Sequence, residues 1–347
     1  MSNDIHLDDD NRLELEELQI LLNIMGNRLR IGYPLYDFDF LEAHTDYDGY
    51  KIKVTCQESD FDKRLARTRG RNHSFELPSY SDFRGGLISS GVLPFTNLAE
   101  FTTRLSTYQT LKKDVKFSLD TNLLYFRFVS NYGLIKPSEI VLVKTVGNEL
   151  KSKLNHKYSP DKLSAVKRLV KNNNHLLDAL WNRRIKRSRK AAYIALWEYR
   201  YILDGVADEL EEFRRPETTN RDNDMIIVKT LSKLEKEGHT FPVLLTADDA
   251  MADLCIAEGL EYFKFDIPHA VEAKKCNYKQ MLNLIFNLAA VYGFIKVNNV
   301  VIFGEFRGKS SNKPNELNLE FSDKNLQSNF VRDLRICRRL MELNIEK

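Results

Sequence analysis

The stretch VKFSLDTNLLYFRF (residues 115–128) contains an apolar, strand-like run that stops at an acidic residue, Asp120. Two short polar residues, Thr121 and Asn122, follow before the apolar residues resume. Two interpretations of Asp120 stay open at this point. The side chain caps the next helix, since Asp is an ordinary capping residue, or its carboxylate holds a metal ion at the carboxyl end of a strand.

Strand-like and helical segments alternate along the middle of the chain. Besides VKFSL, the runs EIVLV (139–143), PVLL (242–245) and LEYFKF (260–265) are apolar and typical of strands buried on both faces. The segments between them read as helices. This alternation predicts an α/β core over residues 114–268, with a parallel sheet and helices on both faces.

The flanking segments differ from this core. Residues 1–113 read as an N-terminal region of mixed α/β structure, with a helix over 10–26 and a glycine-permitted turn over 83–91. Residues 269–347 read as a C-terminal α+β extension: an apolar helix, two strands joined by a polar loop, and a last helix. Within the core, residues 161–213 read as long and helical, with few helix breakers.

Composition limits the class of protein. The chain is 43% hydrophobic and 29% charged with a formal charge of +3, which is typical of a soluble globular protein without a general excess of positive charge. Any affinity for nucleic acid therefore needs a local basic patch.

Cysteine usage and hydropathy indicate the cellular compartment in which we expect the protein. Four widely spaced cysteines without a CxxC pair argue against a zinc site or a disulfide framework and favour a reducing, cytoplasmic setting. The acidic first residues do not resemble a signal peptide. The most apolar segment (281–295) is too short to span a bilayer, so we expect a buried core helix there and no membrane partner.

Acidic residues recur at one structural position, the end of a strand or the start of a helix. They are Asp120, Glu149, Asp222, Asp224, Asp248 and Asp249. Each one alone is an ordinary helix cap. Gathered in one cleft, however, carboxylates repel one another unless a cation lies among them, and oxygen ligands suit Mg²⁺ or Mn²⁺.

The order of these motifs resembles the PIN-domain nucleases. SLDTNLL, IVLVKTVGNEL, NDMII and LLTADDAM follow one another between residues 115 and 267. They match that family's Asp-Thr/Ser-Asn, V-x-x-E-L, D-x-x-I and Thr-x-Asp patterns. The matching acids are Asp120, Glu149, Asp224 and Asp248, and the accompanying polar residues are Thr121, Asn122 and Thr246. The resemblance implies a PIN-like core and a metal-dependent phosphodiesterase that acts on RNA.

The resemblance also implies roles for these residues. Asp120, Asp224 and Asp248 would hold Mg²⁺ or Mn²⁺, and Glu149 would be a further ligand or orient the attacking water. Asp222 and Asp249 are second choices as ligands. The side chains of Thr121, Asn122 and Thr246 would donate hydrogen bonds that orient the carboxylates.

One departure from the family pattern is the long interval between Glu149 and Asp224, which implies a helical insert over about 156–216. It contains WNRRIKRSRKAAYIALWEYRYIL (181–203). Its basic residues are predicted to contact phosphates; they are Arg183, Arg184, Lys186, Arg187, Arg189 and Lys190. The alternative is a solvated helix face, and Ile194, Trp197 and Tyr201 have the spacing of packing residues. RLARTRGR (64–71) is a second basic cluster.

We therefore expect an endoribonuclease that uses four acidic residues to hold Mg²⁺ or Mn²⁺. A structure-specific DNA nuclease and a non-catalytic nucleic-acid-binding or complex-assembly protein remain alternatives. All four acidic positions are filled, which argues against a decayed site. The expected partner is RNA, or single-stranded or structured DNA. The N- and C-terminal regions are candidates for contacts with a second copy or another protein.

Overall fold

The computed structural model describes residues 11–66, 74–170, 172–181, 183–205, 207–213, 223–238, 240–309 and 313–343. The chain forms two compact units. The first unit comprises Met1–Val92, His156–Arg189 and Val271–Lys347, and the second comprises Leu93–Asn155 and Lys190–Ala270. Each unit is therefore assembled from segments that are far apart in the sequence.

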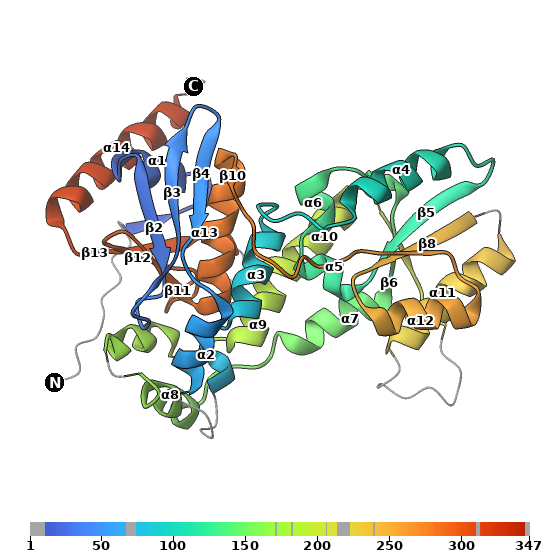
Figure 1. Cartoon of the computed structure of the whole chain (residues 1–347), viewed down its shortest axis with the longest axis horizontal. Helices are drawn as coiled ribbons and strands as arrows, with labels where there is room; N and C mark the ends of the chain where they lie inside the picture. Colours follow the sequence, from blue (N-terminus) through green and yellow to red (C-terminus); the bar gives the residue numbers. More distant parts are fainter. Residues whose placement is uncertain are drawn as a thin grey trace. The chain divides into compact units, whose positions relative to one another are not determined.

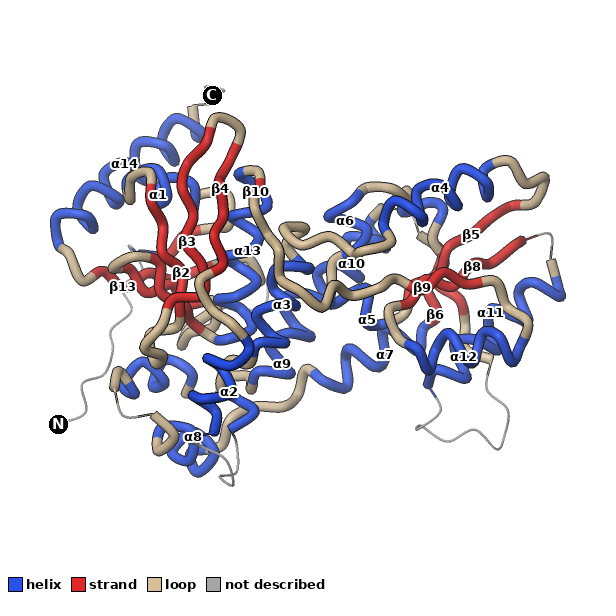
Figure 2. The backbone as a smooth tube through the Cα atoms, in the orientation of Figure 1, coloured by secondary structure: helices blue, strands red, loops and turns tan. Residues whose placement is uncertain are grey.

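An eight-stranded antiparallel sheet, within the described residues, organises the first unit (Figures 1 and 2). Its order is β1-β13-β12-β11-β2-β3-β4-β10. The strands are β1 (Arg12–Leu13), β2 (Arg28–Gly32), β3 (Asp39–Asp46), β4 (Gly49–Val54), β10 (Lys275–Cys276), β11 (Phe294–Val297), β12 (Val300–Phe303) and β13 (Leu317–Phe321). Strands β2 and β11 are neighbours, with Ile31 opposite Val297.

The sheet therefore joins the two ends of the chain in one unit, whereas the sequence predicts three consecutive domains. The predicted insert (156–216) is divided as well, since His156–Arg189 belongs to the first unit. Long-range antiparallel pairing carries no local sequence signal, so it could not be foreseen from periodicity. The predicted strand pair near the C-terminus is confirmed as β12 and β13.

The helices of the first unit surround a dense aromatic core. They are α1 (Leu18–Ile24), α2 (Glu58–Ala66), η2 (Ser74–Glu76), α3 (Tyr80–Ser89), α8 (Pro160–Lys167), η4 (Asn174–Leu180), α9 (Lys186–Lys190, which ends at the unit boundary), α13 (Tyr278–Tyr292) and α14 (Lys324–Glu342). The ring centroid of Phe40 lies 5.2 Å from that of Phe61, 5.4 Å from that of Phe83 and 5.9 Å from that of Tyr292. The prediction of a buried core helix is confirmed by α13, which is buried from Leu284 to Tyr292.

Three local predictions for these segments need correction. The glycine-rich stretch 83–91 is not a turn: it lies mostly in α3, which Ser79 and Asp82 cap reciprocally. Burial of Phe83 and Leu87 offsets the low helix propensity of its two glycines. The helix predicted over 10–26 is preceded by β1 and is shorter than expected. Residues 161–213 are interrupted by 3₁₀ and π-helical segments and contain the strand Asp208–Leu210.

Alanine substitutions at the two adjacent glycines of α3 are expected to change stability in opposite directions. A Cβ at Gly85 meets nothing within 4 Å, so Gly85→Ala is expected to stabilise the helix by about 0.5–1 kcal/mol. A Cβ at Gly86 lies 2.5 Å from Leu288 Cδ2, and this overpacking should outweigh the helical gain, with a net loss of about 1 kcal/mol. Urea unfolding of both variants tests this. Equal stability of the two would contradict the packing of α3 on α13.

The second unit contains the α/β core. Its strands are β5 (Asp114–Leu119), β6 (Val141–Val143), β7 (Asp208–Leu210), β8 (Thr240–Thr246) and β9 (Tyr262–Lys264). Strands β5, β8 and β9 form a parallel sheet, and β6 and β7 form a parallel pair. A parallel bridge between Phe117 and Ile140 brings the two groups together, so the strand order is β7-β6-β5-β8-β9.

Helices lie on both faces of this parallel sheet, as predicted. They are α4 (Leu98–Gln109), α5 (Thr121–Tyr125), α6 (Phe128–Tyr132), η3 (Pro137–Glu139), α7 (Lys144–Lys153), η5 (Ala191–Ala195), α10 (Leu196–Asp204), α11 (Asn223–Glu237) and α12 (Asp249–Glu258). Figure 1 shows α4 on one side of the sheet and α11 and α12 on the other. Aromatic rings fill the α4 side, where the centroids of Phe128 and Phe265 are 4.6 Å apart.

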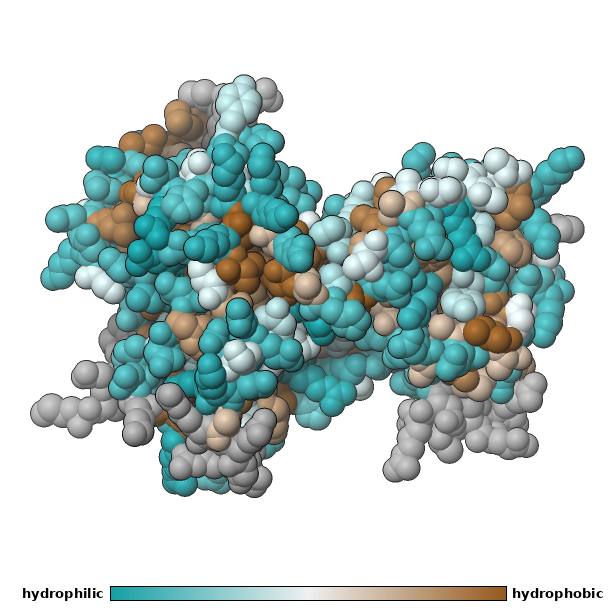
Figure 3. All heavy atoms as spheres, viewed as in Figure 1, coloured by the Kyte–Doolittle hydropathy of each residue, from teal (hydrophilic) through white to brown (hydrophobic). Residues whose placement is uncertain are grey.

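The face of the molecule drawn in Figure 3 is mostly polar. In Figure 3, hydrophobic residues form small patches among hydrophilic ones, and one of these patches lies over α14. There Ile336, Leu340, Met341 and Leu343 are all exposed. Within the described parts of the chain, no helix is both long enough and apolar enough to cross a lipid bilayer.

Candidate active site

The carboxyl edge of the parallel sheet in the second unit gathers the predicted acidic residues. Asp120 directly follows β5, and Asp248 lies two residues after β8. These strands are neighbours in register, with Leu119 opposite Leu245, and the backbone N–H of Asp120 donates to the carbonyl of Leu245 at 3.0 Å. The two strand ends therefore meet side by side.

The strand order places the acidic residues at the edge where open α/β sheets commonly bind ligands. From β5 the chain continues to β6 on one side, and it later returns to β8 on the other side of β5. In open α/β sheets generally, the carboxyl ends of the strands at such a reversal are where ligands bind. Glu149 lies in α7, which follows β6 of this sheet. Asp224 lies in the first turn of α11, which precedes β8.

The side chain of Asp120 distinguishes between the two interpretations of the opening motif. Asp120 occupies the N-cap position of α5, but its side chain makes no capping hydrogen bond. Its Oδ2 instead accepts from Thr246 Oγ1 at 3.0 Å and from Asn122 Nδ2 at 3.1 Å. The residue is only 4% exposed. Asp120 is therefore a buried carboxylate held by two polar neighbours and not a helix cap.

Asp248 is linked to Asp120 through Thr246. The backbone N–H of Asp248 donates to Thr246 Oγ1 at 3.0 Å, and that hydroxyl donates in turn to Asp120. Unlike Asp120, Asp248 does cap its helix: its Oδ1 accepts from the N–H of Ala250 at 2.9 Å. One oxygen of Asp248 is thus used in capping α12, and Oδ2 remains for a further contact.

Glu149 is held by a hydroxyl and a cation. Thr121 Oγ1 donates to its Oε2 at 2.7 Å, and Lys153, one turn further along α7, forms an ion pair with its Oε1. Thr121, Asn122 and Thr246 therefore each contact one of the acidic residues. Lys153 was not predicted, although its position four residues after Glu149 is the usual spacing of a helical ion pair.

The carboxylates influence one another. Burial is the main cause that raises the pKa of Asp120 to about 6, the hydrogen bond from Thr246 opposes this, and the charges of Asp224 and Asp248 raise the pKa further. Asp224 is exposed as a residue, yet partial loss of water around its carboxylate, followed by the charges of Glu149 and Asp248, raises its pKa as well. Lys153 acts in the opposite direction. The site therefore carries an excess of negative charge.

Not all of the predicted ligands lie together. Asp249 is directed to Lys264, with Oδ1 2.5 Å from Nζ, and its side chain is 87% exposed. Asp222 lies outside the described residues. Among the His, Cys, Asp and Glu side chains that the structure describes, no group of three or more is arranged to hold a metal ion. The charges of four acidic residues therefore act on one another, but their described side chains do not form a closed metal centre. These residues are Asp120, Glu149, Asp224 and Asp248.

The raised pKa of Asp120 predicts how stability depends on pH. The folded pKa of about 6 lies above the ordinary value of 3.8, so the folded protein binds more protons between these values and stability falls as the pH rises through them. Asp120→Asn keeps an oxygen for the Thr246 hydroxyl. We expect it to raise the free energy of unfolding at pH 7 by about 2 kcal/mol and to change it little below pH 4. Urea unfolding at both pH values tests this, and an equal effect at the two would contradict it.

Most of the predicted nucleic-acid-binding residues lie in the first unit and make internal contacts. Lys186 Nζ donates to Asp82 Oδ2 at 2.7 Å and to the carbonyl of Leu77 at 2.9 Å. Arg183 Nε lies 4.0 Å from Glu305 Oε1. The prediction of a surface contact is wrong for Arg189, which is 0% exposed and lies against Gly293 and Leu180. A run of basic residues in the sequence does not show which face of a short helix is buried.

The remaining basic residues stay candidates for nucleic-acid contact. Arg187 is exposed, Arg184 and Lys190 are half-buried, and Lys190 belongs to the second unit. Residues 67–71 of the second basic cluster lie outside the described residues. The packing role predicted for Ile194 is confirmed by its burial, whereas Tyr201 is 42% exposed and stacks on Trp197 with 5.6 Å between ring centroids.

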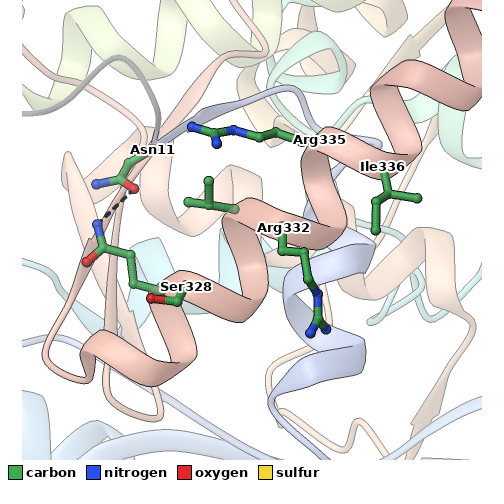
Figure 4. Close-up of a pocket in the computed structure, with 7 residues that line it drawn as sticks. Asn11, Ser328, Arg332, Arg335 and Ile336 are labelled. Atoms are coloured by element: carbon green, nitrogen blue, oxygen red, sulfur yellow. Dashed lines mark hydrogen bonds between the residues drawn. The ribbon is translucent and has the colours of Figure 1, made fainter.

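Two surface pockets lie away from these acidic residues, in the first unit. One, of about 490 Å³, lies along α14 and is shown in Figure 4, where Asn11 Oδ1 accepts from Gln327 Nε2 at 3.2 Å. The other, of about 470 Å³, has Tyr33, Asp39 and Glu320 in its lining. Neither pocket contains a predicted site residue, so the acidic edge of the parallel sheet remains the candidate active site.

Comparison with known proteins adds little to this geometry. No family model and no curated protein matches the chain. One solved structure similar to it is a domain of a functionally unknown protein from Methanocaldococcus jannaschii DSM 2661. The identity is 16%, the match covers 45% of this chain and 94% of that chain, and the TM-score is 0.29. A similarity at that level supports no inference about fold or activity.

Proposed function

We propose that the protein is a metal-dependent nuclease of the PIN-like type, an endoribonuclease that cleaves RNA with Mg²⁺ or Mn²⁺. One observation carries the proposal: Asp120 is buried at the carboxyl end of β5, is held by Thr246 from β8, and makes no capping bond. A carboxylate whose pKa is raised by burial, and further by neighbouring acids, is typical of a functional site.

The residues fit a divalent metal ion in their chemistry. Asp120, Asp224 and Asp248 supply only oxygen ligands, and their mutual repulsion is relieved by a cation among them. Glu149 is the fourth candidate, either as a ligand or as the base that orients water. When bound, such an ion would polarise a phosphate oxygen and lower the pKa of a bound water.

The protein's own residues would prepare this chemistry in defined ways. Thr246 fixes the orientation of Asp120 and, through the Asp248 N–H, the position of the second strand end. Thr121 fixes the orientation of Glu149 in the same manner. Rigid placement of carboxylates by neighbouring hydroxyls raises metal affinity and activity in metal sites.

The test is incubation of the purified protein with labelled single-stranded RNA, with DNA of the same sequence and with a branched DNA, in Mn²⁺ or in EDTA. We expect cleavage of the RNA that requires Mn²⁺. Preferential cleavage of branched DNA would instead support a structure-specific DNA nuclease. Absence of cleavage on every substrate, together with no heat of Mn²⁺ binding in calorimetry, would refute the enzymatic proposal and favour a non-catalytic binding protein.

A further inference from the structure

One surface pocket of the first unit combines acidic, basic and aromatic side chains. Its volume of about 470 Å³ is within the range of about 300–1,000 Å³ that is typical of small-molecule sites. Tyr33 and Tyr36, which are both buried, belong to its lining. Two distant segments of the lining are joined, because Asn173 Nδ2 donates to the carbonyl of Pro34 at 3.0 Å. The walls of the pocket are therefore held together by the fold of this unit.

One row of residues across five strands of the antiparallel sheet supplies much of this lining. Glu320 in β13 is opposite Val301 in β12, and Val301 is opposite Lys296 in β11. Lys296 is in turn opposite Gly32 in β2, and Gly32 is opposite Asp39 in β3. Residues directly opposite one another on neighbouring strands project their side chains from the same face of the sheet. Glu320, Lys296 and Asp39 therefore share one face, in that order.

The two acids of this row are spaced differently from the lysine. Glu320 is two strands away from Lys296, about 10 Å between backbones, and the side chain of Val301 comes between them. Asp39 is also two strands away, but its Oδ1 lies only 2.8 Å from the position that a Cβ would take at Gly32. Since glycine has no side chain, the Asp39 carboxylate lies over the strand next to Lys296. One carboxylate is thus one strand from the lysine, and the other is beyond an apolar residue.

The charged groups of this row are not paired with one another. Within the described parts of the chain, Asp39, Lys296 and Glu320 form no ion pair, and Glu320 Oε2 is buried without a hydrogen-bond partner. An unsatisfied buried oxygen costs free energy, which a donor on a ligand would recover. Asp37 and His175 also line the pocket, so three carboxylates accompany one lysine. A ligand with a net positive charge is therefore favoured.

We propose that this pocket binds a free α-amino acid with a cationic side chain, and that arginine fits it best. The α-ammonium group would contact Asp39 and the α-carboxylate would contact Lys296, since these two groups of the ligand are as close together as their partners in the row. The methylene chain would lie over Val301. The guanidinium group would then reach Glu320, because its planar set of donors matches both oxygens of a carboxylate.

Two other cationic ligands fit the row less well. A single metal ion cannot bridge it, because Asp39 and Glu320 are four strands apart, about 19 Å between backbones. A polyamine has no anionic group for Lys296 and would place an ammonium group against it. The alternation of acid, base and acid along the row therefore favours an amino acid over a simple polycation.

Calorimetry with ligands that differ by one group tests each contact. The purified protein is titrated with L-arginine, with agmatine, which lacks the α-carboxylate, and with L-citrulline, whose side chain is uncharged. We expect L-arginine to bind about tenfold more tightly than either analogue, since each analogue loses one charge-assisted hydrogen bond. Equal affinity for L-arginine and agmatine, tighter binding of spermidine than of L-arginine, or no heat with any of these ligands would overturn the amino-acid site.

Two substitutions connect these differences to particular residues. Lys296→Met should weaken L-arginine binding about tenfold and leave agmatine binding no weaker, because agmatine has no carboxylate. Glu320→Gln should weaken L-arginine binding about tenfold and leave L-citrulline binding unchanged. A variant that weakens L-arginine and the relevant analogue equally, or weakens neither, would overturn the contact assigned to that residue.

The matched control is Lys53→Met. It removes an exposed lysine of β4, in the same sheet, that does not line the pocket. This variant should bind L-arginine as the wild type does, and circular dichroism confirms that each variant is folded. An equal loss of L-arginine affinity in Lys53→Met and Lys296→Met would overturn the assignment of the ligand to this pocket.

Discussion

Asp120→Asn is expected to lower the rate of Mn²⁺-dependent RNA cleavage by about a thousandfold. A ligand charge that stabilises the metal-bound transition state contributes several kcal/mol, and a loss of about 4 kcal/mol corresponds to this factor. The substitution preserves the size of the side chain and an acceptor for Thr246 Oγ1. Loss of activity should therefore come without loss of folding, and single-turnover cleavage with saturating enzyme measures it directly.

The matched control for this prediction is Asp249→Asn. Asp249 is adjacent to the site in sequence, but its carboxylate pairs with Lys264 and its side chain is 87% exposed. This variant should keep nearly the full rate. Equal rates for Asp120→Asn and the wild type would remove Asp120 from the site, while an equally large loss in Asp249→Asn would show that the acidic residues are assigned wrongly.

Gly304→Ala is expected to destabilise the first unit by more than about 3 kcal/mol. A Cβ at Gly304 would lie 2.4 Å from the carbonyl carbon of Ala289 and 2.4 Å from the backbone nitrogen of Ala290. Both atoms belong to the backbone of the buried helix α13, which cannot move aside as a side chain can. Overpacking against such a rigid neighbour exceeds the usual cost of a small-to-large change.

Urea unfolding and the yield of soluble protein measure this effect. Gly85→Ala is the control, since it adds the same methyl group at a position with nothing within 4 Å. The expected result is a low midpoint or insoluble protein for Gly304→Ala and an unchanged or higher midpoint for Gly85→Ala. Similar midpoints for the two variants would contradict the close contact between the segment after β12 and helix α13.

The sequence predicted the local elements of the second unit well. Strands β5, β6, β8 and β9 follow from short apolar runs, and α11 and α12 from helical spacing that ends at Gly238 and Gly259. The pairing of α3 with α13 shows the limit of such reasoning. The two glycines of α3 predicted a turn in the sequence. Residues 83–91 are nevertheless mostly helical, because Phe83 and Leu87 are buried against other segments.

The candidate site was predicted in part. Acids at strand ends identified Asp120 and its neighbours, because the carboxyl ends of parallel strands meet at one edge. The motif match ranked Asp248 ahead of Asp249, and the structure adds that the Asp249 carboxylate pairs with Lys264. In the first unit, the sequence did not reveal that Asp39, Lys296 and Glu320 lie in one row, because they come from three separate strands.

The sequence by itself determined which segments form buried strands and helices, and that acidic residues lie at their ends. Both features depend on residues within a few positions of one another. The tertiary structure decided which distant segments share a sheet, and therefore that both ends of the chain belong to one unit. It also decided that Asp120 is held by Thr246 and does not cap its helix. Both outcomes depend on contacts between residues more than a hundred positions apart, and the local periodicity of a sequence does not predict such contacts.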